Sequence, residues 1–135
     1  DFRSLSFRFD TPDASIVYTG DTGPSDAVIR LARGADMLVT ELIDIDATTA
    51  NIRRRATDLT SSDLANMETH LRTHHITTAD IGAMAREAGV GEVVITHIAG
   101  GGSSEPAAAD RYVREVQAQF DGPVRVASDL DRFRP

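Results

Sequence analysis

The sequence predicts an α/β fold in which strands form a sheet and helices cover at least one of its faces. Short apolar segments with the period of strands alternate along the chain with amphipathic segments of helical period. Turn and capping residues separate these segments. The 135 residues, 41% of them hydrophobic, are enough for one compact core, and no linker or internal repeat interrupts them. We therefore treat residues 1 to 135 as one unit.

The N-terminal part of the chain predicts a β-hairpin. Leu5, Phe7 and Phe9 alternate with polar residues, which is the period of a half-buried strand. Residues 11 to 13 form a turn that contains proline, and residues 15 to 18 provide a short second arm rich in β-forming side chains.

A helix and another strand follow the hairpin. Ser25 is a suitable N-cap residue, and Gly34 ends the helix that begins there. The apolar face of this helix consists of Val28, Ile29, Leu31 and Ala32. Residues 37 to 40 then predict a buried strand, which Glu41 follows directly.

Residues 44 to 74 predict a helical insertion, because the segment is polar and compatible with helix. A helix starting near Ser62 or Asp63 would bury a stripe formed by Leu59, Leu64, Met67 and Leu71. The same segment contains the one basic run of the chain, Arg53, Arg54 and Arg55. Such a run is more often a solvated helix face than a phosphate clamp.

The next segment contains a well-marked helix and a strand. Thr77 with Asp80 three residues later has the pattern of a capping box, and Gly89 ends the helix. Residues 93 to 96 are apolar and predict a strand that delivers His97.

The C-terminal part predicts a loop, a helix and a last strand. Residues 100 to 104 form the glycine-rich loop, residues 106 to 120 the helix, and residues 124 to 127 the strand.

Composition restricts the chemistry that this chain can perform. The formal charge of −7, from 14 basic and 21 acidic residues, repels polyanions, so we expect a small-molecule substrate and no nucleic acid partner. The absence of cysteine excludes disulfides, thiolate nucleophiles and sulfur-ligated metals. Any metal must therefore use His, Asp or Glu. The chain has neither a lysine-type phosphate loop nor a Gly-x-Ser-x-Gly elbow, so nothing in it favours a nucleotide triphosphatase or a serine hydrolase.

Hydropathy predicts neither a membrane segment nor a leader. No apolar run approaches the roughly 18 residues that a membrane-spanning helix needs, and no charged-then-apolar segment opens the chain. The expectation is a cytoplasmic protein without membrane contact. The chain begins at Asp1 rather than Met, from which we expect a further region upstream.

Asp21 and His97 each follow a predicted strand. Functional groups in open α/β sheets commonly lie beyond strand ends, and Gly20 and Gly23 allow the backbone beside Asp21 to approach a ligand closely. Imidazole is a frequent zinc ligand, and a strand end would fix the direction of His97. A plain turn aspartate and a structural histidine give the same patterns.

The remaining histidines and Glu41 are weaker candidates. His70 and His74 share a helix face at a spacing that can bind metal, but the catalytic glutamate of such motifs is absent. His75 directly precedes the capped helix and could enter a cleft. Glu41 would lie near Asp21 if their strands are neighbours, either orienting a ligand or forming a salt bridge.

Four blocks of sequence, in this order, resemble the second half of the metallo-β-lactamase superfamily. They are Tyr-Thr-Gly-Asp-Thr-Gly-Pro-Ser at 18 to 25, Ala-Asp-Met-Leu-Val-Thr-Glu at 35 to 41, His-Ile-Thr-Thr-Ala-Asp-Ile-Gly at 75 to 82, and Ala-Gly-Val-Gly-Glu-Val-Val-Ile-Thr-His at 88 to 97. The resemblance is greatest to the branch that contains the tRNA 3′-processing ribonuclease Z, phosphodiesterases and arylsulfatases. It implies an αββα sandwich, with this chain as its C-terminal half of sheet and helices.

The resemblance also implies roles for individual residues. Asp21 matches the aspartate that bridges two metal ions, and His97 matches the histidine that completes the shell of the second ion. The implied cofactor is a pair of zinc ions, with manganese or iron as alternatives. His75 matches a residue that faces the scissile phosphate and assists the leaving group, although adjacent His74 could compete for this role. The implied function is hydrolysis of an ester, phosphodiester or similar small anionic substrate through a hydroxide held by two metals.

The chain departs from the family in one large respect. The His-x-His-x-Asp-His block and a further metal-binding histidine are absent from its residues. Two ligands cannot hold a zinc pair, so the upstream half of the same domain is an expected partner, and this chain alone is expected to be inactive. A homo-oligomer is also compatible with the sequence.

Two alternatives to the enzyme remain open at this point. One is a non-catalytic structural or regulatory module on the same fold. The other is a plain doubly wound domain with an accidental motif, in which Asp21 and His97 would lie more than about 8 Å apart.

Overall fold

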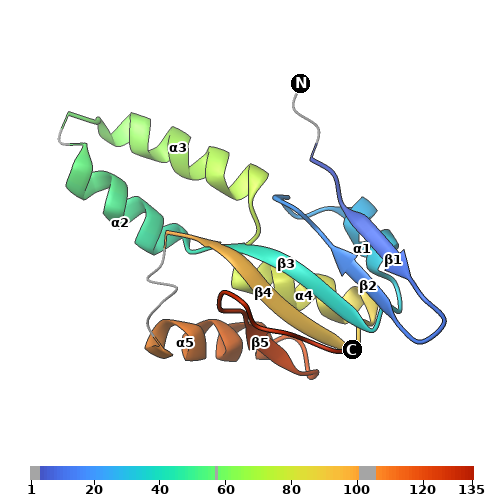
Figure 1. The fold of residues 1–135 in the computed structure, drawn as a ribbon. Helices are drawn as coiled ribbons and strands as arrows, with labels where there is room; N and C mark the ends of the chain where they lie inside the picture. Colours follow the sequence, from blue (N-terminus) through green and yellow to red (C-terminus); the bar gives the residue numbers. More distant parts are fainter. Residues whose placement is uncertain (1–3, 57, 101–105) are drawn as a thin grey trace.

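The computed structural model describes residues 4–56, 58–100 and 106–135. Its centre is a five-stranded sheet in the order β1-β2-β3-β4-β5 (Figure 1). The strands are β1 (Phe7–Asp10), β2 (Ser15–Tyr18), β3 (Met37–Ile43), β4 (Glu92–Ala99) and β5 (Val124–Val126). Only β1 and β2 pair antiparallel, as the predicted hairpin requires, and the other neighbours are parallel. The α/β fold class predicted from the sequence is confirmed.

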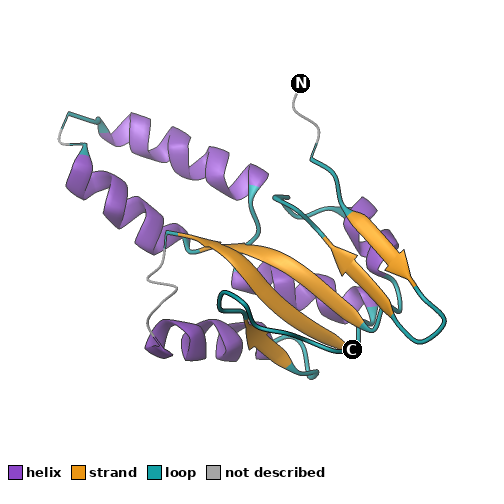
Figure 2. Ribbon diagram, viewed as in Figure 1, coloured by secondary structure: helices purple, strands orange, loops and turns teal. Residues whose placement is uncertain are grey.

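Three helices cover one face of the sheet: α1 (Asp26–Ala32), α4 (Thr78–Ala88) and α5 (Pro106–Gln117). The core lies between them and side chains of the central strands such as Val17, Leu38 and Val93, all fully buried. Figure 2 shows two further helices, α2 (Ile45–Arg55) and α3 (Ser61–His74), projecting beyond the end of the sheet. The segment from 101 to 104, most of the predicted glycine-rich loop, lies outside the described residues.

The hairpin is shorter than its apolar pattern predicts. β1 begins at Phe7, which pairs with Tyr18, the last residue of β2. The backbone ladder stops at this pair, although the two segments stay close, since the Ser6 hydroxyl donates to the carbonyl of Thr19 at 2.7 Å. Gly20, with a φ of +61°, lies next to the carbonyl of Leu5, so Leu5 faces the loop after β2 outside the regular strand pairing.

Capping residues set the start of α4 as predicted. The Thr77 hydroxyl accepts from the Asp80 backbone N–H, and the Asp80 carboxylate accepts from the Thr77 N–H. Gly89 ends the helix in the left-handed region, with a φ of +65°. Ser25 occupies the N-cap position of α1, but its side chain makes no capping hydrogen bond.

The predicted helical segment around residues 44 to 74 forms a helical hairpin, α2 followed by α3. The predicted stripe of Leu59, Leu64, Met67 and Leu71 is only half-buried, and α3 has no buried residue. The reason is that α2, not the sheet, is the element that packs along α3. None of the helices in the described part of the chain is long and apolar enough to cross a membrane.

The face of the sheet opposite α1, α4 and α5 carries exposed aromatic side chains. Phe7 is 49% exposed, Phe9 56% and Tyr18 41%. Paired residues of neighbouring strands project to the same face, and Phe7 pairs with Tyr18, which in turn pairs with Val39. The rings of Phe7 and Phe9 stack with their centroids 6.4 Å apart. This apolar face has no helix of the described chain packed over it.

Candidate active site

The loop after β2 and the irregular part of β4 bring Asp21 and His97 together. The Nε2 atom of His97 lies 3.4 Å from the Oδ1 atom of Asp21. Both side chains are accessible, with exposed fractions of 63% and 54%. The doubly wound alternative required a separation above about 8 Å and is inconsistent with this distance.

A β-bulge directs His97 toward Asp21. In the pairing of β3 with β4, Thr40 faces Ile95 but Leu42 faces Ile98, so Glu41 has two residues opposite it. His97 is one of these two, and its φ of 45° is uncommon for a residue other than glycine. His97 therefore lies inside a strand rather than at its end, and the local backbone twist re-aims its side chain.

Two close backbone approaches hold the loop that carries Asp21. A Cβ atom on Gly20 would lie 2.9 Å from the carbonyl oxygen of Leu5. A Cβ atom on Gly23 would lie only 2.1 Å from the carbonyl oxygen of Thr73, at the end of α3. The two glycines thus let the loop fit between the start of the hairpin and the helical hairpin.

Glu41 connects this loop to His75. Its Oε1 atom accepts the backbone N–H of Thr22 at 2.7 Å, and its Oε2 atom lies 2.8 Å from Nδ1 of His75. Glu41 is only 2% exposed. Burial raises its pKa, and the hydrogen bonds from His75 and from the Thr22 N–H oppose the rise by stabilising the ionised form.

The structure separates the two adjacent histidines. His75 faces Glu41, whereas the ring of His74 lies 4.4 Å from that of His70, centroid to centroid, on the exposed side of α3. His70 and His74 therefore lie apart from the Glu41 contact. The basic run at the end of α2 is exposed, as expected of a solvated helix face.

The direct partner of Glu41 was not predicted from the sequence. Strand order predicted only that Glu41 lies near Asp21, whereas its carboxylate contacts His75 and the backbone beside Asp21. Glu41 also lies inside β3 rather than after it. The signals that were available were a glutamate next to an apolar strand segment and a histidine directly before a capped helix, 34 residues further on.

The chemistry and spacing of Asp21 and His97 fit one metal ion. A carboxylate oxygen and an imidazole nitrogen, each about 2.0 to 2.2 Å from a tetrahedral zinc, are themselves about 3.4 Å apart. The observed distance of 3.4 Å matches this value. Among the described residues, no group of three or more His, Cys, Asp or Glu side chains could hold a metal, so these two groups are an incomplete ligand set.

Known proteins with similar sequences are ribonucleases Z, although no family model matches the chain. Ribonuclease Z of Mycobacterium tuberculosis strain H37Rv is 30% identical over 129 residues, covering 96% of this chain and 42% of the relative. Ribonuclease Z of Haloarcula marismortui is 34% identical over 118 residues, covering 87% of this chain and 31% of the relative. The chain thus spans less than half the length of either relative.

Solved structures show the same relationship in the fold. The metallo-β-lactamase fold protein YhfI from Bacillus subtilis superposes with a TM-score of 0.62 at 23% identity, covering 91% of this chain and 41% of that chain. The short form of human tRNase Z gives a TM-score of 0.51 at 18% identity, covering 93% of this chain and 36% of that chain.

The chain therefore has the fold of the metallo-β-lactamases, of which it represents a part. In sequence the chain is ribonuclease Z-like and in fold it resembles the metallo-β-lactamases, which confirms the resemblance found in its motifs.

Proposed function

We propose that the full-length protein is a metal-dependent hydrolase of phosphodiesters or related small anionic esters. The observation that supports it most is the approach of Asp21 Oδ1 to His97 Nε2 at 3.4 Å, beside the Glu41–His75 pair. Asp21 would bind two cations through its carboxylate. His97 would complete the shell of one of them. When bound, two such cations supply an activated water and stabilise the charge that develops on the attacked centre.

His75 would act on the leaving oxygen of the substrate. With Nδ1 donating to Glu41, the second ring nitrogen, Nε2, faces away from that carboxylate. In the imidazolium form both nitrogens carry a proton, and Nε2 can then donate a hydrogen bond or a proton. The buried carboxylate of Glu41 fixes the ring orientation, and the Thr22 N–H fixes the carboxylate in turn. The leaving-group role thus belongs to a histidine whose orientation is set by two hydrogen bonds.

The missing ligands would come from the upstream half of the same domain, packed on the apolar face of the sheet. That face exposes the aromatic rings of Phe7, Phe9 and Tyr18, which soluble domains normally cover. It also borders the strand ends that carry Asp21 and His97. A second sheet on this face would complete an αββα sandwich and bring further ligands to the site.

Replacing Phe9 by Asp tests this packing. We expect Phe9→Asp to lower the free energy of unfolding of the full-length protein by about 1.5 to 3 kcal/mol, since a covered aromatic ring would be lost. The measurement is urea denaturation of the full-length protein. Leu130→Asp is the control, because Leu130 is 98% exposed outside the sheet. Equal, small effects of the two changes would argue against a covering sheet.

RNA is the second candidate substrate, because the relatives are named ribonuclease Z and tRNase Z. These names conflict with the expectation that the protein has no nucleic acid partner. The net charge of −7 on this part of the protein opposes a polyanion, so an RNA substrate would need basic residues from elsewhere. We therefore favour a small phosphodiester and retain RNA as an alternative outcome of the test.

Metal removal tests the proposed function directly. We expect the purified full-length protein to contain two equivalents of metal and to hydrolyse bis(4-nitrophenyl) phosphate. Chelation should abolish hydrolysis, and added Zn²⁺ or Mn²⁺ should restore it. Cleavage of a tRNA precursor in place of the small ester would assign the RNA alternative. A full-length protein without bound metal and without turnover would instead support a non-catalytic module.

A further inference from the structure

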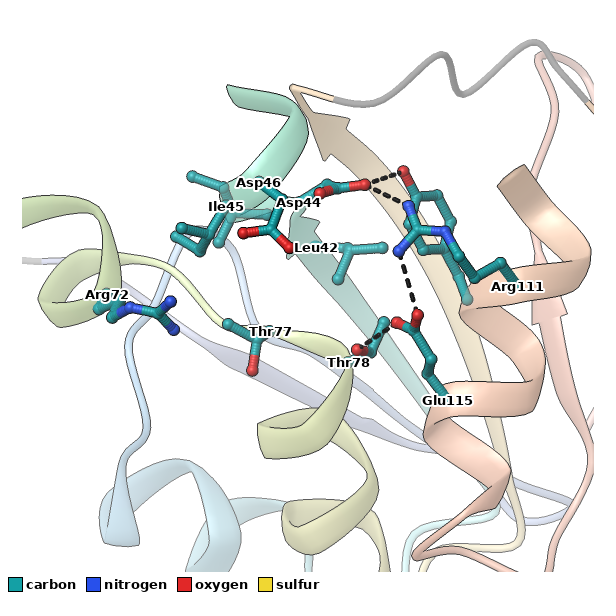
Figure 3. A pocket seen from close by; sticks show the side chains of 11 residues that line it. Leu42, Asp44, Ile45, Asp46, Arg72, Thr77, Thr78, Arg111 and Glu115 are labelled. Carbon is teal, nitrogen blue, oxygen red and sulfur yellow. Dashed lines mark hydrogen bonds and ion pairs between the residues drawn. The ribbon is translucent and has the colours of Figure 1, made fainter. Parts of the chain in front are cut away.

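A buried carboxylate three residues after Glu41 joins three parts of the fold (Figure 3). Asp44 follows β3 and is only 8% exposed. Its side chain accepts the Ala47 N–H at 3.0 Å, which caps α2, and the Tyr112 hydroxyl at 2.9 Å. It also forms an ion pair with Arg111 of α5. Asp44 is therefore shared between the end of β3, the start of α2 and one face of α5.

The contacts continue from Arg111 to the start of α4. Arg111 donates to Glu115 at 3.0 Å, and Glu115 accepts the hydroxyl of Thr78 at 2.8 Å. Figure 3 shows this chain of contacts along one wall of a cavity of about 200 Å³. We call the four side chains Asp44, Arg111, Glu115 and Thr78 the Asp44 network.

Backbone hydrogen bonds tie the same region to the loops of the site. The Ile43 N–H donates to the carbonyl of Ile76 at 2.9 Å, and the Asp44 N–H donates to the carbonyl of Ala99 at 3.0 Å. Ile76 directly follows His75, and Ala99 lies close after the bulge in β4. The backbone beside Asp44 thus contacts two of the segments that carry site residues.

The Asp44 charge makes the network sensitive to the loss of one member. Burial alone would raise the pKa of Asp44, but the hydrogen bonds from Ala47, Arg111 and Tyr112 outweigh it and hold the pKa below its usual value. Burial and the same carboxylate raise the pKa of Tyr112 to about 12. Without Arg111 the carboxylate would be a buried charge with too little compensation. It would then move toward solvent or take up a proton, and either change disturbs the backbone around it.

We infer that the Asp44 network is a positioning device that keeps His75 in contact with Glu41. The inference rests on the proposed function for its catalytic consequence. The path is short: Asp44 lies three residues after Glu41, and Thr78 lies three residues after His75. The network therefore links both members of the hydrogen-bonded pair through α5, without touching the substrate.

Arg111→Met and Arg125→Met form a matched pair of variants. Each arginine side chain is nearly half exposed, at 45% and 44%, and each pairs with a largely buried carboxylate, Asp44 at 6% and Glu92 at 11%. The Arg125 pair lies at the opposite end of β4, near its first residue. If both ion pairs only stabilise the fold, Arg111→Met and Arg125→Met should have similar effects on the active site.

Two readouts in the full-length protein distinguish a positioning role from a structural one. The first is kcat and KM for bis(4-nitrophenyl) phosphate. The second is the pattern of long-range ¹H–¹⁵N correlations of the histidine rings at a fixed pH, which reports whether His75 Nδ1 is held by Glu41. Exposed His74 serves as the internal reference in the same spectrum.

We expect Arg111→Met to lower kcat by up to about 100-fold with little change in KM, because small misplacements of a reacting group cost this much. The His75 correlations should move toward those of His74, and Arg111→Lys should recover part of both signals. Arg125→Met should leave kcat and the His75 pattern at wild-type values. If Arg111→Met does not fold, Asp44→Asn replaces it, since Asn keeps an acceptor for Ala47 but loses the charge.

An unchanged His75 pattern in both Arg111→Met and Asp44→Asn would overturn the inference. If the wild-type protein shows no turnover, the proposed function is contradicted. The ring correlations of the variants still decide separately whether the Asp44 network positions His75. A fall in kcat with an unchanged His75 pattern would also overturn it, by placing the effect of Arg111 elsewhere.

Discussion

Replacing Asp21 by Ala is expected to lower kcat of the full-length protein by at least about three orders of magnitude. Loss of the carboxylate would remove both the bridge between two cations and several kcal/mol of charge stabilisation, and each 1.36 kcal/mol corresponds to about tenfold in rate. Metal content should fall below two equivalents, measured by elemental analysis alongside the kinetics. In the metal-free protein, the free energy of unfolding should change by no more than about 0.5 kcal/mol, since the side chain is half exposed.

Asp13→Ala is the control for this experiment. Asp13 is an exposed aspartate in the turn of the hairpin, at the far end of β2 from Asp21. It should retain wild-type turnover and metal content. Substantial activity in the Asp21 variant, with metal still bound, would count against Asp21 as a bridging ligand.

Replacing His75 by Ala is expected to lower kcat by about 10² to 10⁴, the usual range for loss of a positioned general acid. The metal content should stay at the wild-type level, because His75 contacts Glu41 and not the Asp21–His97 pair. The free energy of unfolding should fall by about 1 to 3 kcal/mol, since buried Glu41 loses a hydrogen-bond partner. Steady-state kinetics, metal analysis and urea denaturation measure the three effects.

His74→Ala is the matched control, because His74 is the adjacent residue and has the same side chain. It is exposed on α3 next to His70, so its removal should leave kcat, metal content and stability close to wild type. If His74→Ala instead caused the larger loss of kcat, the assignment of His75 to the leaving group would be wrong. The two variants therefore decide between neighbouring histidines that the sequence could not separate.

The sequence by itself determined the local elements and the family. Thr77, Asp80 and Gly89 predicted both ends of α4, because a capping box and a left-handed glycine act through neighbouring residues. The strand of residues 15 to 18 was predicted at its observed bounds. The four motif blocks identified the metallo-β-lactamase relationship, since they carry the residue types and order of that family.

Other features depended on contacts between distant segments. The half-buried stripe of α3 was predicted to be buried, because periodicity reports which side chains share a face but not what packs against that face. Residues 5 and 6 were predicted to extend the first strand, but β1 begins at Phe7, and Ser6 contacts Thr19 through its hydroxyl rather than through the backbone ladder.

The tertiary structure alone decided how the site residues combine. The bulge opposite Glu41 brings His97 to within 3.4 Å of Asp21, and the register of β3 against the loop before α4 selects His75 over His74. The Asp44 network likewise joins residues from three separate segments. Capping and strand period arise from interactions within a few residues, whereas these distances are set by strand pairing and by buried charges that find partners far along the chain.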